Sequence, residues 1–104
     1  MSSDLSSVVI VIPALNEEAS LPLVLADIPP VGAIIVVDNG STDATAEVAV
    51  AGGAEVVSEP RRGYGSACLA GIAAAQDRGF TVLVILDADH SDYIEDLHLL
   101  VDPV

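Results

Sequence analysis

Two carboxylates separated by one residue follow an apolar run of this chain. The run covers residues 82–86, and the acids after it are Asp87 and Asp89. Side chains two positions apart in an extended chain project to the same side, so both carboxylates can act on one target. Such a pair suits a hard divalent cation with a phosphate on its far side. Because acids also follow strands merely to begin a turn, the pair alone is a weak indication.

A further acid, Asp38, follows a second apolar run at residues 33–37. Ligands of open α/β sheets gather at the carboxyl ends of the strands, so an acid at this position adds weight to the first pair. The two strand ends together favour a metal-assisted site for a phosphate-bearing ligand.

Composition limits what such a site can serve. The chain has 104 residues, 52% of them hydrophobic, which predicts a single domain over residues 1–104 with a real core. Sixteen acids against three basic residues give a formal net charge of −13, which argues against unaided binding of nucleic acid or anionic lipid. The apolar runs are shorter than the roughly 20 residues of a membrane helix, so a cytoplasmic location is expected. The single cysteine, Cys68, is expected to be a packed small residue.

Short apolar runs alternate with helical patterns along the whole chain. This alternation predicts an α/β fold, with a mostly parallel sheet of about four strands, right-handed crossovers and helices on both faces. The predicted strands are residues 8–12, 33–37, 55–58 and 81–86. The predicted helices are residues 18–27, a segment between 41–43 and 52–53, residues 65–77, and a short last helix at 93–101. Four loops then meet at one sheet edge: residues 13–17, 38–43, 59–65 and 87–92.

Four motifs in these loops carry a resemblance to a known family. They are Pro-Ala-Leu-Asn-Glu at 13–17, Val-Val-Asp-Asn-Gly-Ser-Thr-Asp at 36–43, Arg-Gly-Tyr-Gly-Ser-Ala at 62–67 and Leu-Asp-Ala-Asp at 86–89. Their order and spacing resemble those of family 2 glycosyltransferases, and most of all the branch of polyprenyl- and dolichyl-phosphate hexose synthases. The resemblance covers about residues 8–101. It implies a Rossmann-like GT-A fold and transfer of a hexose from a nucleotide-diphospho-sugar to an acceptor, a polyprenyl phosphate in that branch.

The resemblance also implies roles for individual residues. Glu17 would lie near the ribose or base, and Asp38 would accept a hydrogen bond from the base, since an ionised carboxylate only accepts. The alternatives are a first-turn acid for Glu17 and a turn residue for Asp38. Asn39 stands where many members carry a second Asp. The residues implied to bind the nucleotide sugar are Pro13, Ala14, Asn16, Glu17, Asp38, Gly40, Arg62, Gly63, Gly65, Asp87, Ala88 and Asp89.

The pair of acids corresponds to the family's D-x-D motif, which implies Mg²⁺ or Mn²⁺ bridging the two phosphates. Asp89 would be the direct ligand, whereas Asp87 would reach the ribose or a metal-bound water. The loop at Gly63 and Gly65 resembles the flexible segment beside the donor, where glycine lets backbone N–H groups approach oxygen atoms. Arg62 would pair with the diphosphate there; a solvated arginine is the alternative.

Family members usually exceed twice this length, and their second half resembles an acceptor platform with the catalytic base. No catalytic residue is therefore assigned here, and the chain is expected to be a donor-binding half that acts at most peripherally at the inner face of a membrane. With that half absent, the strand at 82–86 would be an unpaired edge, which predicts self-association or a partner subunit.

Two other classes stay open. One is a non-catalytic nucleotide-sugar-binding or oligomerisation module derived from the same fold. The other is a phospho-acceptor signalling domain, which the absence of any lysine disfavours. The same absence excludes a P-loop.

Overall fold

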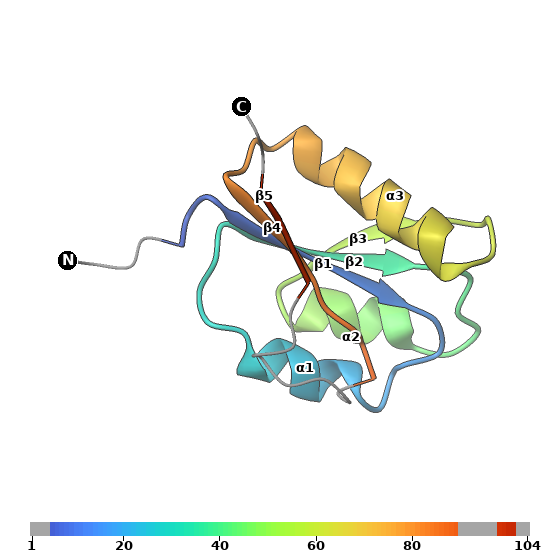
Figure 1. The fold of residues 1–104 in the computed structure, drawn as a ribbon. Coiled ribbons are helices and arrows are strands. Elements are labelled where there is room, and N and C mark those ends of the chain that lie inside the picture. Colours follow the sequence, from blue (N-terminus) through green and yellow to red (C-terminus); the bar gives the residue numbers. More distant parts are fainter. Residues whose placement is uncertain (1–4, 90–97, 102–104) are drawn as a thin grey trace.

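The computed structural model describes residues 5–89 and 98–101. Within them, strands and helices alternate up to the last helix, and the strands form one sheet of order β3-β2-β1-β4-β5 (Figure 1). The elements are β1 (Val8–Ala14), α1 (Leu21–Asp27), β2 (Ala33–Asp38), α2 (Thr45–Ala51), β3 (Glu55–Ser58), α3 (Tyr64–Gln76), β4 (Val82–Ile85) and β5 (His98–Val101). Strands β1 to β4 pair in parallel, as the alternating pattern predicts.

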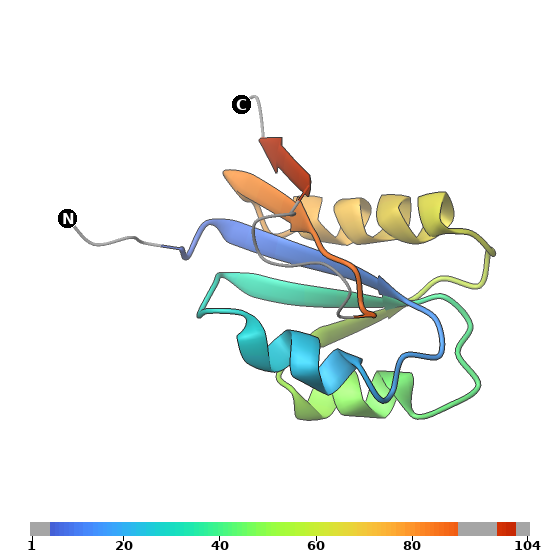
Figure 2. The ribbon, with the colours of Figure 1, turned by 60° about the horizontal axis from the view of Figure 1, so that its bottom comes forward.

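Helices α1 and α2 cover one face of the sheet, and α3 covers the other (Figures 1 and 2). Successive residues of a strand face opposite sides, so β1 supplies both cores. Ile10 and Ile12 pack with Leu21 on the α1 side, whereas Val9 and Val11 pack on the α3 side. This burial on both faces explains why the central strands read as continuous apolar runs.

Small residues let α3 approach the sheet closely. Ala67, Gly71 and Ala75 recur at four-residue intervals and are all buried. A Cβ atom on Gly71 would lie 2.2 Å from Cγ1 of Val11, so only glycine fits there. The close approach brings the first turn of α3, with Tyr64, to the carboxyl ends of the strands.

Strand β1 runs further than its apolar pattern predicts. Its pairing with β4 ends at Val11 opposite Ile85, but its pairing with β2 continues to Ala14 opposite Asp38. Pro13 lies beyond the β4 ladder, where the missing N–H of a proline leaves no ladder bond unmade on that side. The strand therefore carries Pro13 and Ala14 to the edge where the four loops meet.

The predicted last helix is wrong at residues 98–101, and residues 93–97 lie outside the described part of the chain. Residues 98–101 form β5, which pairs antiparallel with β4. Strand β4 offers a row of unpaired backbone groups on this side, and satisfying them outweighs a local helical pattern. The strand at 82–85 is thus flanked by β1 and β5 and is no edge. Self-association stays a prediction, without this edge as its basis.

The first helix begins at Leu21 rather than at residue 18, because residues 18–20 form a turn before it, and the other helices lie within one or two residues of their predicted bounds. Helix α1 has its proline in the first turn, and α2 ends at Gly52. None of the helices in the described part is both long enough and apolar enough to span a bilayer.

Candidate functional site

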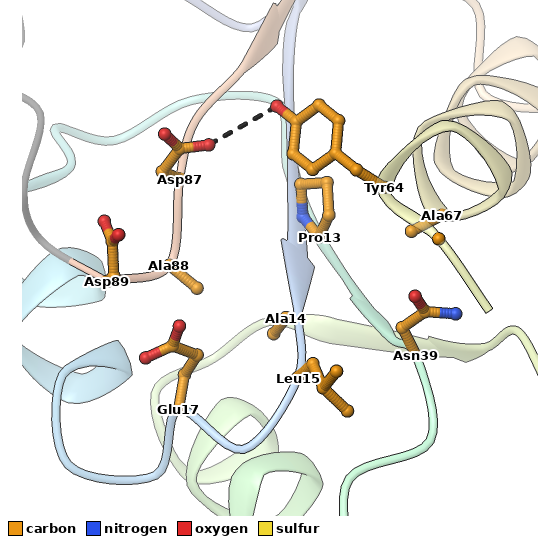
Figure 3. Close-up of a pocket in the computed structure, with 11 residues that line it drawn as sticks. Pro13, Ala14, Leu15, Glu17, Asn39, Tyr64, Ala67, Asp87, Ala88 and Asp89 are labelled. Carbon is orange, nitrogen blue, oxygen red and sulfur yellow. Dashed lines mark hydrogen bonds between the residues drawn. The ribbon is translucent and has the colours of Figure 1, made fainter.

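The loops after β1, β2, β3 and β4, together with the end of β1 and the start of α3, surround a pocket of about 290 Å³ at the carboxyl edge of the sheet (Figure 3). In the close-up, the carboxyl groups of Glu17, Asp87 and Asp89 lie along one side, with Asn39 and Ala67 on the other. The lining residues are Pro13, Ala14, Leu15, Glu17, Asn39, Gly63, Tyr64, Ala67, Asp87, Ala88 and Asp89. Seven of the twelve residues predicted to bind the donor are therefore at this pocket, and Asn16, Asp38, Gly40, Arg62 and Gly65 are outside its lining.

The Asp87-Ala88-Asp89 segment begins where β4 leaves the sheet. Ala88 is buried, Asp87 is half-buried and Asp89 is exposed. The hydroxyl of Tyr64 donates a hydrogen bond to Oδ1 of Asp87 over 3.3 Å. The hydroxyl of Ser20 donates to the carbonyl oxygen of Ala88 over 2.7 Å. The segment is thus held from the α3 side and from the α1 side.

Asn16 braces the neighbouring loop instead of facing the pocket. Its backbone N–H donates to Oγ of Ser41 over 2.9 Å, and its Oδ1 accepts from the N–H of Thr42 over 2.8 Å. Its φ of 55° is in the left-handed region, which asparagine tolerates better than most residues. Asn16 therefore positions the loop after β2 relative to the loop after β1.

Glu17 is held by a buried threonine at the start of α2. Its backbone N–H donates to Oγ1 of Thr45 over 2.9 Å, and the Thr45 hydroxyl in turn donates to Asp43. Asp43 also accepts from the backbone N–H of Thr45 and of Glu18. The side-chain hydrogen bond from Thr45 is the main cause that lowers the pKa of Asp43 below its ordinary value. The Glu17 carboxylate lines the pocket, and its Oε1 accepts a hydrogen bond from the Ser20 hydroxyl over 2.9 Å.

Asp38 and Gly40 form the turn after β2. Oδ1 of Asp38 accepts a hydrogen bond from the N–H of Ser41 over 2.9 Å, and Gly40 has a φ of 93°. These contacts match the alternative stated for Asp38, a turn residue, although a carboxylate keeps further acceptor sites beyond one hydrogen bond.

Asn39 has a role that sequence reasoning missed. It is 6% exposed and lines the pocket, and its Nδ2 donates to the carbonyl oxygens of Glu59 over 2.8 Å and of Arg61 over 2.7 Å. An aspartate cannot make these bonds because it has no donor. The asparagine at this position ties the loop after β3, including Gly63, to the end of β2.

The loop between β3 and α3 carries two arginines, Arg61 and Arg62, directly before pocket-lining Gly63. Gly63 lines the pocket with a φ of 116°, a conformation that favours glycine. Arg61 pairs with Glu59 over 3.8 Å, and Arg78 pairs with Glu55. Arg62 is exposed and makes no ion pair with any residue that the structure describes. Its guanidinium is open to an anionic ligand, and Arg61, which is 86% exposed and pairs only through Nε, is engaged weakly.

Tyr64 and Cys68 extend the site along α3. The Tyr64 side chain is 55% exposed and borders the pocket beside Pro13 (Figure 3). Desolvation raises the pKa of Tyr64, and the nearby Cys68 and Asp87 raise it further. Burial likewise raises the pKa of the Cys68 thiol. Both groups are therefore neutral near pH 7. Cys68 is half-buried and is not part of either core cluster, so the predicted packing of this small residue is only partial.

The carboxylates at the pocket suit a metal ion that also binds to oxygen atoms of a ligand. Glu17, Asp87 and Asp89 supply three carboxylates to the pocket lining, and no arginine is part of it. No cluster of three or more potential metal ligands occurs within residues 5–89 and 98–101. Mg²⁺ commonly binds through one or two carboxylates together with substrate phosphates and waters. Asp87 and Asp89 fit that mode, and they do not fit a cage made of protein ligands alone.

Comparison with known proteins identifies the family. A model of the family described as glycosyl transferase family 2 matches residues 9–104. This chain belongs to glycosyltransferase family 2. It is 53% identical over 95 residues to an uncharacterized glycosyltransferase of Mycobacterium tuberculosis, covering 91% of this chain and 42% of the relative. It is 39% identical over 105 residues to the polyprenol monophosphomannose synthase of Mycolicibacterium smegmatis, covering 91% of this chain and 40% of that enzyme.

Solved structures of glucosyl-3-phosphoglycerate synthase from Mycobacterium tuberculosis share the fold. Two of them, each 37% identical with a TM-score of 0.70, cover 79% of this chain and 33% of that protein. One contains Mn²⁺, UDP and glucosyl-3-phosphoglycerate, and the other contains Mg²⁺ and UDP. The chain thus has the nucleotide-sugar-binding GT-A fold of this family. It spans about two fifths of the length of the curated relatives and a third of the solved one.

Proposed function

We propose that this chain holds the donor of a hexosyltransferase, a nucleotide-diphospho-sugar, with a divalent metal ion at Asp87 and Asp89. The observation that carries the proposal is the pocket at the carboxyl edge, which the two carboxylates of a D-x-D segment line together with Glu17. A diphosphate entering a pocket lined by three acids meets repulsion unless a cation accompanies it. A net charge of −13 strengthens that requirement.

Asp89 is the proposed direct ligand of Mg²⁺ or Mn²⁺, because its side chain is exposed at the pocket. Asp87 shares Oδ1 with the Tyr64 hydroxyl, which suits a contact to ribose or to a metal-bound water. When bound, the ion offsets the negative charge on the departing nucleoside diphosphate. Arg62 is the proposed partner of a diphosphate oxygen from the loop after β3.

The base is proposed to meet Asp38 and the end of β1. Asp38 precedes pocket-lining Asn39, and its carboxylate has acceptor capacity beyond the Ser41 N–H. Pro13 and Ala14 form the apolar floor beside it, since both are buried and line the pocket.

A phosphate-bearing acceptor is the proposed partner of the donor, and a polyprenyl phosphate is its first candidate. The synthases similar to this chain are named for polyprenol monophosphomannose and for glucosyl-3-phosphoglycerate, both of which contain phosphate. Sequence similarity to the polyprenol enzyme covers more of the chain than that to the glucosyl-3-phosphoglycerate synthase, 91% against 77%. An action at the cytoplasmic face of a membrane is part of this proposal.

The test is calorimetric titration of UDP and GDP, each with and without Mn²⁺. We expect the preferred nucleotide to bind at least about tenfold more tightly with the metal, a difference of about 1.4 kcal/mol. Asp89→Ala should lose that increment and keep the fold, since an exposed loop acid contributes little stability. Asp77→Ala, an exposed acid after the end of α3, is the matched control. Equal affinity of Asp89→Ala and the parent in the presence of Mn²⁺ would contradict the metal role.

The base contact has a separate test. Asp38→Ala should weaken the binding of nucleosides and nucleotides by similar factors, with or without metal. If nucleosides bound the variant as they bind the parent, Asp38 would have no contact with the base.

A further inference from the structure

The hydroxyl of Ser20 connects two walls of the pocket. Its Oγ is 2.7 Å from the carbonyl oxygen of Ala88 and 2.9 Å from Oε1 of Glu17. Ser20 is half-buried between the two, although Ala88 is 68 residues away along the chain. The side chains of Glu17, Asp87 and Asp89 all line the pocket, whereas Ser20 stands behind it.

Helix capping does not explain this hydroxyl. Ser20 is the N-cap residue of α1, a position at which serine commonly accepts a hydrogen bond from the second or third helical N–H. Its side chain makes no such bond, and its backbone carbonyl already accepts from the N–H groups of Leu23 and Val24. The Ser20 hydroxyl is therefore committed to the pocket loops rather than to the helix.

One proton serves two acceptors here. A serine hydroxyl donates a single hydrogen bond at a time, so Ala88 and Glu17 compete for it. A ligand hydroxyl or N–H that donates a hydrogen bond to the Glu17 carboxylate weakens the hydrogen bond from Ser20 to Glu17. The Ser20 proton then points to the Ala88 carbonyl and restrains the turn that carries Asp87 and Asp89.

We infer that Ser20 is a positioning residue that couples donor contact at Glu17 to the placement of the two metal-binding carboxylates. The inference rests on the proposed function, because it assumes that donor and metal share this pocket. In this proposal Ser20 itself contacts neither the donor nor the metal ion. It acts through the Ala88 carbonyl, which lies between the two acids in the chain.

The test measures how much Mn²⁺ tightens UDP binding, and how much UDP tightens Mn²⁺ binding, by calorimetry on the full chain. Coupling between two sites is reciprocal, so both factors must agree within one protein. We expect Ser20→Ala to reduce this factor at least about fivefold, since coupling typically spans about 5- to 150-fold. The affinity for uracil without metal should stay within about twofold, because the base is proposed to contact Asp38 and the end of β1 rather than the turn.

Two variants separate positioning from a general structural effect. Ser20→Thr retains the hydroxyl and should restore most of the coupling. Ser7→Ala removes a hydroxyl before β1, at the opposite end of the sheet, and should leave the coupling unchanged. Amide hydrogen exchange of the ligand-free proteins gives a second readout, with faster exchange at residues 87–89 in Ser20→Ala than in Ser7→Ala.

The outcomes distinguish the two proposals. A parent protein that binds no UDP, or binds it without regard to Mn²⁺, would overturn the proposed function and the coupling together. A parent with metal-dependent binding and a Ser20→Ala variant with the same coupling factor and the same exchange at 87–89 would overturn the role of Ser20 alone.

Discussion

Backbone hydrogen bonds join remote segments at both ends of the sheet, and at the carboxyl ends, where the backbone N–H of Asn39 donates to the carbonyl oxygen of Ala14 over 2.9 Å, side chains add to them. At the carboxyl ends, side chains of Asn16, Ser20, Asn39 and Thr45 bond to the backbone of neighbouring loops. At the amino ends, the chain bonds backbone to backbone, and Gly32 donates to the carbonyl oxygens of both Leu5 and Val8 over 3.0 Å. Thr81 similarly donates its backbone N–H to the carbonyl oxygen of Ser7 over 2.9 Å.

Because of this difference, the two ends should respond differently to substitution: one in the free energy of unfolding, the other in the shape of the pocket. Backbone bonds form whatever the side chains are, but they demand close approach, so the amino end depends on small residues. Side-chain bonds depend on the chemical identity of each residue, so the carboxyl end can be altered one contact at a time. Substitutions at the amino end should therefore cost most in free energy of unfolding, whereas those at the carboxyl end should mainly move the pocket.

The largest expected effect is that of Gly32→Ala. A Cβ atom there would lie 2.1 Å from the carbonyl oxygen of Ser6 and 3.0 Å from that of Val8. Backbone atoms cannot retreat without breaking the bonds of the Gly32 N–H, so we expect a loss of about 3 kcal/mol in free energy of unfolding, measured by urea denaturation. Gly65→Ala is the control: apart from its chain neighbours and the backbone of its own helix, no atom lies within 4 Å of its Cβ position, and we expect a gain of about 0.5 kcal/mol. Equal stability of Gly32→Ala and the parent would remove the basis of the comparison.

Asn39→Asp should have the next largest effect. The substitution replaces two N–H donors with carboxylate oxygens facing the carbonyl oxygens of Glu59 and Arg61, so both hydrogen bonds are lost. We expect a loss of about 2 kcal/mol at pH 7, with faster amide exchange at residues 59–63. Asp38→Asn is the matched control, because an amide oxygen can still accept from the Ser41 N–H. Unchanged exchange in the 59–63 loop would show that Asn39 does not hold it.

Thr45→Val should lower the free energy of unfolding by less than Asn39→Asp does, and the loss should depend on pH. Loss of the hydroxyl leaves the Glu17 N–H without its partner, at a cost of about 1 kcal/mol at pH 7. The hydroxyl is also the main cause of the lowered pKa of Asp43, whose ordinary value is 3.8. A carboxyl with a lowered pKa stabilises the folded state above its ordinary pKa, and this contribution disappears as the pH falls through the lowered value.

Thermal melts of parent and Thr45→Val at several pH values check this. The difference in Tm should be largest near neutral pH and should shrink as the pH falls below about 4. Thr42→Val, which alters an exposed threonine in the same loop, should show no such pH dependence. A Tm difference that stayed constant down to about pH 2 would mean that Asp43 is not stabilised by Thr45.

Tyr64→Phe should have the smallest effect on stability. The hydrogen bond to Asp87 is 3.3 Å long and the tyrosine is 55% exposed, so its loss should cost under about 0.5 kcal/mol in urea denaturation. Tyr64→Ala, which removes the ring from the pocket lining, is the comparison for any change in nucleotide affinity. A loss above about 1 kcal/mol in Tyr64→Phe would show that the carboxyl end also carries stability.

The parallel sheet and the meeting of its loops were predictable from the sequence. Strands buried on both faces read as continuous apolar runs, and right-handed crossovers between them put all carboxyl ends at one edge. The positions of Glu17, Asp87 and Asp89 at a common pocket follow from that topology. The family also followed from the order and spacing of four motifs, and the match over residues 9–104 confirms it.

Strand β5 was not predictable in the same way. Residues 98–101 are too short a segment for apolar periodicity to separate a strand from a helix. These residues form a strand because the side of β4 away from β1 has backbone N–H and C=O groups that need partners, and pairing with β5 supplies them.

The residue types and their spacing along the chain determined that acids would stand at strand ends, since side chains two apart share a side. Which atoms those acids and their neighbours bond to was decided only by the tertiary structure. Ser20 is the N-cap residue of α1, within the helix predicted at residues 18–27, yet its hydroxyl bonds to a carbonyl 68 residues away. Asn39 is predictable as a turn residue, yet its amide holds a loop 20 residues further on. A hydrogen bond requires a partner within about 3 Å, and a distance that short between remote segments exists only once the sheet has brought the loops together.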